Sequence, residues 1–136
     1  LTDAALHTLQ PARRALGFGM TLRDASAFNV QLHAGRPVWI DTLSFETARE
    51  GTPWAAYRQF CQHFLAPLAL VAHRDARLGT LSRVHLDGVP LDLATSLLPA
   101  RANPYQIAGI DEHFSRRRLE RRCISWPRAN DNDPRA

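Results

Sequence analysis

The chain has 136 residues, of which 45% are hydrophobic, so it is long enough for one small core and too short for two domains of ordinary size. All 17 basic residues are arginine, and the net charge of +4 arises mostly in residues 101–136, so the composition alone does not predict a nucleic-acid-binding protein. No run of about eighteen apolar residues is present, which excludes a transmembrane helix from the sequence.

Cysteine use predicts a reducing compartment. Cys61 and Cys123 are far apart in the sequence, and we expect two free thiols in the cytoplasm. The 6 histidines are scattered without metal-ligand spacing. The chain begins at Leu1 without an initiator methionine, which suits a mature product or a fragment.

The first predicted element is a helix from residue 3 to about residue 16. Asp3 is expected to cap its start, and Pro11 predicts a kink or a later start because proline removes a backbone donor. Its apolar face consists of Leu6, Leu9 and Leu16.

Two short strands are predicted next, over residues 28–33 and 37–40. Residues 34–36 between them are expected to form a hairpin loop. The fold class is therefore α+β, mainly helical with a short β-hairpin.

A long helix is predicted after the hairpin. Thr52 and Pro53 resemble an N-cap followed by proline in the first turn, and Pro67 predicts a kink or a split. Its apolar residues recur at helical spacing and are expected in the core: Trp54, Tyr57, Phe60, Cys61, Phe64, Leu65 and Leu68.

The end of the chain differs from the rest. A last short helix is predicted from Pro90 to Leu98, and apolar periodicity is nearly lost afterwards. We therefore predict a folded unit over residues 1–99 and an Arg-rich, disordered tail over residues 100–136, with an out-of-frame extension as the alternative for the tail.

Three side chains have the residue types and spacing that phosphoryl transfer requires. Asp24 and Asn29 stand in a D-x-x-x-x-N pattern, and the second predicted strand ends on Asp41. A hairpin between them brings Asp41 back beside Asn29. Carboxylate and amide oxygens are the ligands that Mg²⁺ prefers, so a metal site is predicted here.

This region resembles the catalytic lobe of protein kinases and aminoglycoside phosphotransferases over roughly residues 3–75. The resemblance implies that Asp24 is the catalytic base, that Asn29 and Asp41 bind the metal, and that the cofactor is a Mg-nucleotide. The sequence departs from the family at Leu22, where a histidine is usual, and at Thr42–Leu43, where Phe-Gly is usual. It also lacks lysine and a Gly-rich phosphate loop, so we expect a C-lobe fragment that is inactive alone.

A second resemblance covers residues 17–99. It rests on the segments Gly19–Val30, Arg36–Glu46, Pro53–Cys61, Phe64–Leu70 and Gly88–Ala94. These are similar to bacterial class I SAM-dependent methyltransferases related to host-specificity nodulation proteins, in which this region precedes the methyltransferase domain. The resemblance implies a larger parent transferase whose SAM site lies outside this chain, with a missing N-lobe or a downstream methyltransferase domain as partner.

Three functions remain open from the sequence. The first is an inactive accessory or scaffold module of a larger protein. The second is a Mg-nucleotide-dependent transferase, in which Ser44, Glu46 and Arg58 would help to bind substrate. The third, nucleic-acid binding through the tail, is disfavoured because acids are interspersed among its arginines.

Overall fold

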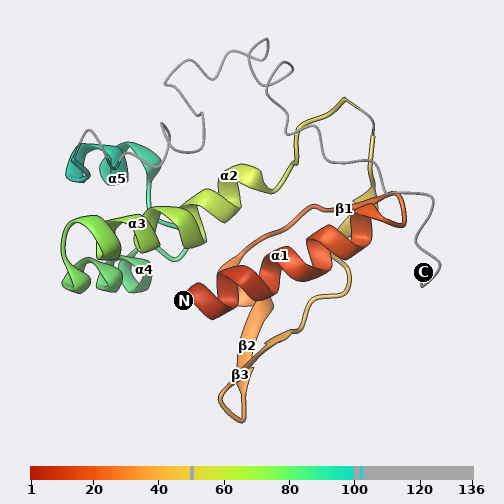
Figure 1. The fold of residues 1–136 in the computed structure, drawn as a ribbon, viewed down its shortest axis with the longest axis horizontal. Helices are drawn as coiled ribbons and strands as arrows, with labels where there is room; N and C mark the ends of the chain where they lie inside the picture. Colours follow the sequence, from red (N-terminus) through yellow and green to blue (C-terminus); the bar gives the residue numbers. More distant parts are fainter. Residues whose placement is uncertain (50, 100–101, 103–136) are drawn as a thin grey trace.

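The computed structural model describes residues 1–49, 51–99 and 102 (Figure 1). This part contains helices and two small antiparallel sheets, which confirms the predicted α+β class and its helical majority. Apart from Ala102, the predicted tail over residues 100–136 lies outside the described residues.

Helix α1 (Thr2–Leu16) begins earlier than predicted and continues through Pro11. Leu1 occupies the N-cap position without a side-chain hydrogen bond, so the predicted capping role of Asp3 is wrong. Asp3 lies instead in the first turn, where a negative charge is favoured by the helix dipole.

The buried side of α1 is made of small residues. Ala5 and Thr8 are buried, and the Thr8 hydroxyl donates to the Ala4 carbonyl at 2.9 Å. The predicted apolar face is present but points outward, since Leu6, Leu9 and Leu16 are 56%, 38% and 40% exposed. Alanine and threonine allow close packing on this side, whereas the leucines keep between 38% and 56% of their surface exposed.

Two strand pairs follow. Strand β1 (Met20–Leu22) pairs antiparallel with β4 (Phe45–Thr47), and neither strand was predicted from the sequence. After the 3₁₀ turn η1 (Ala27–Asn29), β2 (Val30–His33) pairs with β3 (Arg36–Trp39). This confirms the hairpin, which projects below α1 in Figure 1.

The hairpin loop is one residue shorter than predicted. Ala34 and Gly35 have φ values of 49° and 76°, which are the backbone angles of a two-residue turn with both central residues left-handed. Arg36 consequently belongs to β3 and pairs with His33.

The long helix begins at Tyr57, so its predicted start at Thr52 is wrong. The Trp54 indole donates to the Leu22 carbonyl at 2.6 Å and ties this stretch of chain to β1. The helix then runs without a break through α2 (Tyr57–Phe60), the π-helical segment η2 (Cys61–Leu65) and α3 (Ala66–His73). Pro67 lies in the first turn of α3, and the wide π turn directly precedes it.

The remaining elements are η3 (Ala76–Thr80), α4 (Leu81–Val84) and α5 (Leu91–Leu97). The first two were not predicted, whereas the last predicted helix is confirmed, with Pro90 at its N-cap.

The described residues form two buried clusters. The first unites α1, β1 and the start of the long helix through Ala5, Leu22, Ala25, Ala56, Phe60 and Phe64. The second unites α3 and α5 through Ala66, Leu70, Val89, Ala94 and Leu98.

Candidate functional site

Two loops that carry the predicted metal ligands face each other. The β1–β4 ladder extends by one bond, in which the Arg23 amide donates to the Ser44 carbonyl at 2.7 Å. The β2–β3 ladder extends in the same way, with the Ile40 amide donating to the Asn29 carbonyl at 2.9 Å. Residues 23–29 are thus joined to residues 40–44 at both ends.

This closure brings Asp24, Asn29 and Asp41 into one region. Asp24 and Asn29 lie on the first loop and are linked directly, since the Asn29 amide nitrogen donates to the Asp24 carbonyl at 3.3 Å. Asp41 lies on the second loop, one residue beyond the backbone bond to Asn29. The hairpin therefore returns Asp41 to Asn29, as the sequence predicted.

The Asp24 carboxylate organises its own turn. It accepts a hydrogen bond from the Ser26 amide at 2.8 Å, and the Ser26 hydroxyl accepts one from the Phe28 amide at 3.2 Å. The Gln59 side chain of α2 fixes the same turn, because its carbonyl accepts the buried Ala25 amide at 2.7 Å. Asp24 is partly buried in this turn.

The Asp41 carboxylate likewise accepts hydrogen bonds from its own loop. Its donors are the Ser44 hydroxyl and the Leu43 amide, the latter at 2.8 Å. The Ser44 hydrogen bond contributes most to lowering the pKa of Asp41 below its usual range, followed by the Leu43 amide, while desolvation opposes them and the Arg23 charge adds a smaller lowering. Asp41 is therefore ionised at neutral pH.

The three residues predicted to assist substrate binding lie in different places. Ser44 is buried and bonded to Asp41. Glu46 is an exposed residue of β4 that pairs with Thr21, and Arg58 is an exposed residue of α2. Of the three, Ser44 is the one that the structure joins to a predicted metal ligand.

His63 belongs to the same region but was not singled out from the sequence. It is buried in η2, and its ring packs edge-on against Phe28 with 6.1 Å between centroids. Burial lowers its pKa, while the charges of Asp24 and Asp87 oppose that shift. Gln59 and His63 are polar residues four apart in an otherwise apolar helical stripe, and that spacing was the available signal.

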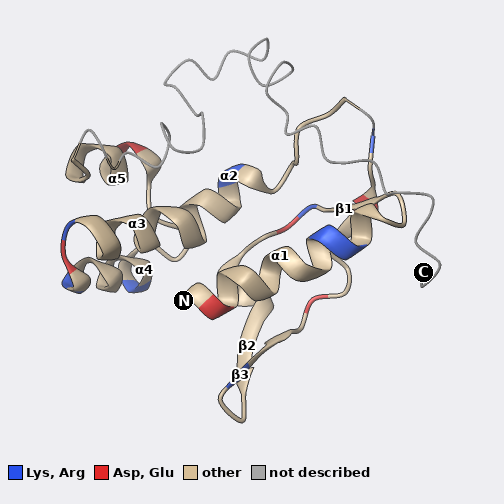
Figure 2. Ribbon diagram, in the orientation of Figure 1, with Lys and Arg blue, Asp and Glu red and all other residues tan. Residues whose placement is uncertain are grey.

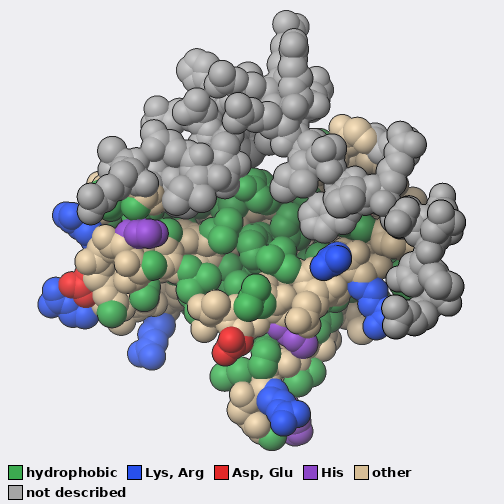
Figure 3. Space-filling model, in the orientation of Figure 1, with side chains coloured by type: hydrophobic (Ala, Val, Ile, Leu, Met, Phe, Trp, Pro, Cys, Tyr) green, Lys and Arg blue, Asp and Glu red, His purple; other side chains and the backbone are tan. Residues whose placement is uncertain are grey.

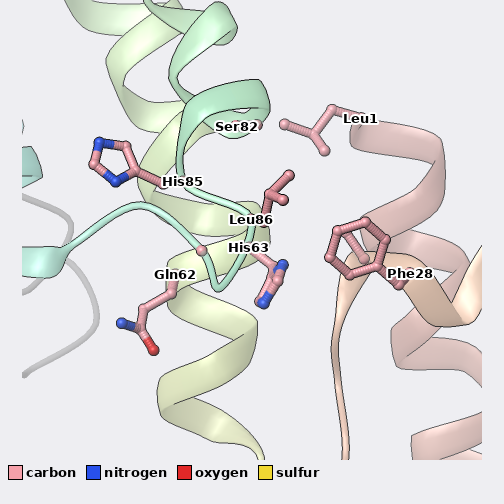
Figure 4. Close-up of a pocket in the computed structure, with 9 residues that line it drawn as sticks. Leu1, Phe28, Gln62, His63, Ser82, His85 and Leu86 are labelled. Atoms are coloured by element: carbon pink, nitrogen blue, oxygen red, sulfur yellow. The ribbon is translucent and has the colours of Figure 1, made fainter.

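A cavity of about 140 Å³ lies beside His63 (Figure 4). Small-molecule sites usually measure about 300–1,000 Å³, so this cavity is large enough for a few waters or one side chain. The Ser82 hydroxyl, on its wall, is buried without a hydrogen-bond partner among the described residues. The lining residues are Leu1, Ala27, Phe28, Gln62, His63, Ser82, His85, Leu86 and Gly88.

Within the described residues, no group of three or more His, Cys, Asp or Glu side chains is placed to hold a metal ion. The predicted metal ligands, Asn29 and Asp41, are not such a group, because one of them is an amide. In the same part of the chain, no helix is long and apolar enough to cross a bilayer.

Comparison with known proteins relates this chain to a nodulation protein. It is 41% identical over 101 residues to Nodulation protein NoeA of Rhizobium meliloti (strain 1021). The match covers 74% of this chain and 21% of NoeA, so the chain spans about a fifth of that relative. No protein-family model matches the chain, and no solved structure does. The similarity supports the nodulation-related part of the sequence resemblance.

Proposed function

We propose that this chain is a kinase-like docking module of a nodulation-related protein and is not a catalyst by itself. In this proposal residues 1–99 are the module, the compartment is the cytoplasm, and any methyltransferase or SAM chemistry belongs to a larger protein. The module's task is to pack against another polypeptide.

The observation that carries the proposal is the outward leucine face of α1, defined as Leu6, Leu9 and Leu16. Fully burying one leucine stabilises a protein by about 1.5–3 kcal/mol relative to leaving it in water. Leu6, Leu9 and Leu16 are 56%, 38% and 40% exposed, so roughly half of this free energy remains available for an interface. Phe18 and Met20, which are 74% and 39% exposed, extend the apolar surface beyond the helix.

Hydrophobic side chains also gather on one face of the molecule. Figure 3 shows hydrophobic side chains gathered near the middle of one face, over α1 and the neighbouring helical segment. Large contiguous apolar patches on soluble proteins mark interaction sites more often than scattered single residues do. The similarity to about a fifth of NoeA fits a module that serves alongside further sequence.

Dye binding tests the docking proposal. The purified chain is expected to increase the fluorescence of anilinonaphthalene sulfonate, and the triple variant Leu6→Gln, Leu9→Gln, Leu16→Gln is expected to lose most of that increase. Val84→Gln serves as the control, since Val84 is 75% exposed on α4. A monomeric chain that does not bind the dye would contradict the proposal.

A second candidate function is supported by the two facing loops. Asn29 uses its amide nitrogen on the Asp24 carbonyl, which leaves its amide oxygen for a ligand. The Asp41 carboxylate is ionised and retains lone pairs beyond its two hydrogen bonds. These donors fit Mg²⁺, which would bridge nucleotide phosphates while Asp24 oriented an attacking hydroxyl.

Calorimetry with Mg-ATP distinguishes this candidate from the first. Binding that is lost in both Asp41→Asn and Asn29→Ala would support a nucleotide site. Asp75→Asn is the matched control, because Asp75 also accepts a hydrogen bond from the backbone two residues on. If the chain does not bind Mg-ATP, or if both loop variants bind it equally well, the metal-site assignment fails.

A further inference from the structure

We propose that the leucine face of α1 pairs with the same face of a second copy of this chain, in antiparallel orientation. The proposal rests on the docking function above and names the partner. The leucines recur at intervals of three and seven residues, which is the spacing of a narrow helix–helix seam. Arg13 lies on the same face between Leu9 and Leu16, at the position that continues the pattern.

The charges of α1 favour a partner of the same sequence. Asp3 lies in the first turn, whereas Arg13 and Arg14 lie in the last, and all three are exposed. Figure 2 shows this separation along α1, with an acidic start and a basic second half. When two such helices run antiparallel, Asp3 of each copy faces Arg13 and Arg14 of the other.

Parallel pairing has the opposite effect. It would place Arg13 against Arg13 and Asp3 against Asp3, and like charges across an interface are unfavourable. The helix dipoles also oppose parallel alignment. In a two-fold antiparallel pair, both the side-chain charges and the helix dipoles attract, and the symmetry repeats each contact.

The angular position of each charge around the helix also supports the antiparallel orientation. At 100° per residue, Asp3 and Arg14 lie on the same flank of the leucine face, at opposite ends of the helix. In an antiparallel pair, matching flanks face each other. The register that aligns Asp3 with Arg14 places Leu9 of both copies close to the two-fold axis.

The proposed contact is small, so we expect a weak dimer. One helix of 15 residues with Phe18 at its end covers less than the roughly 800 Å² per partner of a standard interface. Dimerisation should therefore depend on concentration. It should also weaken with salt, because the charge pairs are exposed.

Sedimentation velocity of the full chain over a wide range of concentrations is the first test. We expect a monomer–dimer equilibrium that Leu9→Asp shifts to at least tenfold higher concentration. Val84→Asp places the same charge on an exposed apolar residue of α4 and should leave the equilibrium unchanged. Circular dichroism confirms that both variants keep the helical content of the parent chain.

A charge exchange provides the sharper test. Asp3→Arg makes the whole face basic, and the double variant Arg13→Asp, Arg14→Asp makes it acidic. Each variant alone should lose dimerisation at low salt, because like charges then meet across the seam. An equal mixture of the two should form a heterodimer, because opposite charges then meet across the seam, and a contact elsewhere on the chain does not predict this. The single variants test the orientation, because a parallel pair already places like charges together in the parent chain and should change little with Asp3→Arg.

The outcomes separate this proposal from the docking function. A chain that is monomeric at all concentrations but binds the dye through the leucine face overturns the second copy as partner and leaves docking intact. A chain that is monomeric and binds no dye overturns both. A dimer that Leu9→Asp does not weaken, or a charge-exchanged mixture that stays monomeric, overturns the antiparallel α1 interface alone.

Discussion

Individual side chains at the two facing loops act mainly on the backbone of their own turns. Asp24 accepts the Ser26 amide, and Asp41 accepts the Leu43 amide. Aspartate is well suited to this arrangement, since its short carboxylate reaches an amide two residues on. The loops are therefore preformed, whether they serve as a docking surface or as a ligand site.

The first prediction concerns the acid side of the stability curve. The pKa of Asp41 lies below its ordinary value of 3.8 in the folded chain, mainly because of the Ser44 hydrogen bond. Its contribution to stability is therefore present above the unfolded-state pKa and is lost as the pH falls through the lower, folded-state pKa. Denaturant unfolding between about pH 5 and pH 2 should show a smaller loss of stability for Asp41→Asn than for the parent chain.

Ser44→Ala provides the companion measurement for that prediction. Carboxyl chemical shifts followed by NMR during an acid titration should show the pKa of Asp41 rising toward 3.8. An unchanged pKa in this variant would mean that Leu43 and Arg23 account for the shift without the hydroxyl.

The second prediction concerns Gln59, which joins the first loop to α2. Gln59→Leu leaves the fully buried Ala25 amide without its partner, and a buried unsatisfied donor costs about 1–3 kcal/mol. Chemical denaturation measures the loss. Arg58→Ala, at the exposed neighbouring position, should change the free energy of unfolding by less than about 0.5 kcal/mol, and equal effects would refute the role of Gln59.

At the scale of elements, the π segment η2 connects both halves of the described chain. Its middle residue, His63, packs against Phe28 of the loop that carries Asp24. On another side, the Gln62 carbonyl accepts the Val89 amide at 2.9 Å, which holds the turn before α5 against the helix. A wide turn just before Pro67 thus provides backbone and side-chain contacts to two other segments.

The third prediction concerns Gly88, which lies close to Gln62 of this segment. Its φ is +94°, and an added Cβ would lie 2.6 Å from the Cβ of Gln62 and 3.1 Å from its backbone carbon. Gly88→Ala should therefore lower the free energy of unfolding by about 2–4 kcal/mol, because backbone strain and a steric clash combine.

Gly35→Ala is the matched control for the Gly88 substitution. Gly35 has a φ of +76°, but an added Cβ meets nothing within 4 Å. Its cost should be about 1 kcal/mol, from backbone strain alone. If thermal unfolding shows equal losses of stability for the two variants, the clash with Gln62 does not contribute at Gly88.

At the scale of the whole molecule, one helix runs through two buried clusters. Phe64 belongs to the first cluster and Leu70 to the second, and both are fully buried. They lie on the same uninterrupted helical stretch, so loss of packing at one end should be felt at the other. We therefore expect the two clusters to unfold in one transition.

The fourth prediction uses tryptophan fluorescence to test this coupling. Trp39 and Trp54 pack against the first cluster, and the third tryptophan is removed by Trp126→Phe. In that background, Leu70→Ala should lower the fluorescence-detected stability by about 2–5 kcal/mol, although it lies in the second cluster. Phe64→Ala should cost about 3–5 kcal/mol. A fluorescence transition that Leu70→Ala leaves unchanged would mean that the clusters unfold separately.

Local sequence signals determined the elements that need only neighbouring residues. The hairpin, the helix from Leu91 to Leu97 and the stripe around Phe60 and Phe64 follow from turn residues, proline position and apolar spacing. The spacing of Asp24, Asn29 and Asp41 predicted that the hairpin returns one loop to the other, and backbone hydrogen bonds place them so. Their roles as base and metal ligands remain predictions.

Tertiary contacts decided the rest, because they join residues that no local pattern links. The β1–β4 pair involves strands of three residues each, too short for an alternating pattern to emerge. The long helix begins at Tyr57 instead of near Thr52, and before this start the Trp54 indole donates to the Leu22 carbonyl. The apolar spacing of α1 revealed its leucine face, but the small residues fitted the core more closely, and so packing turned the leucines outward.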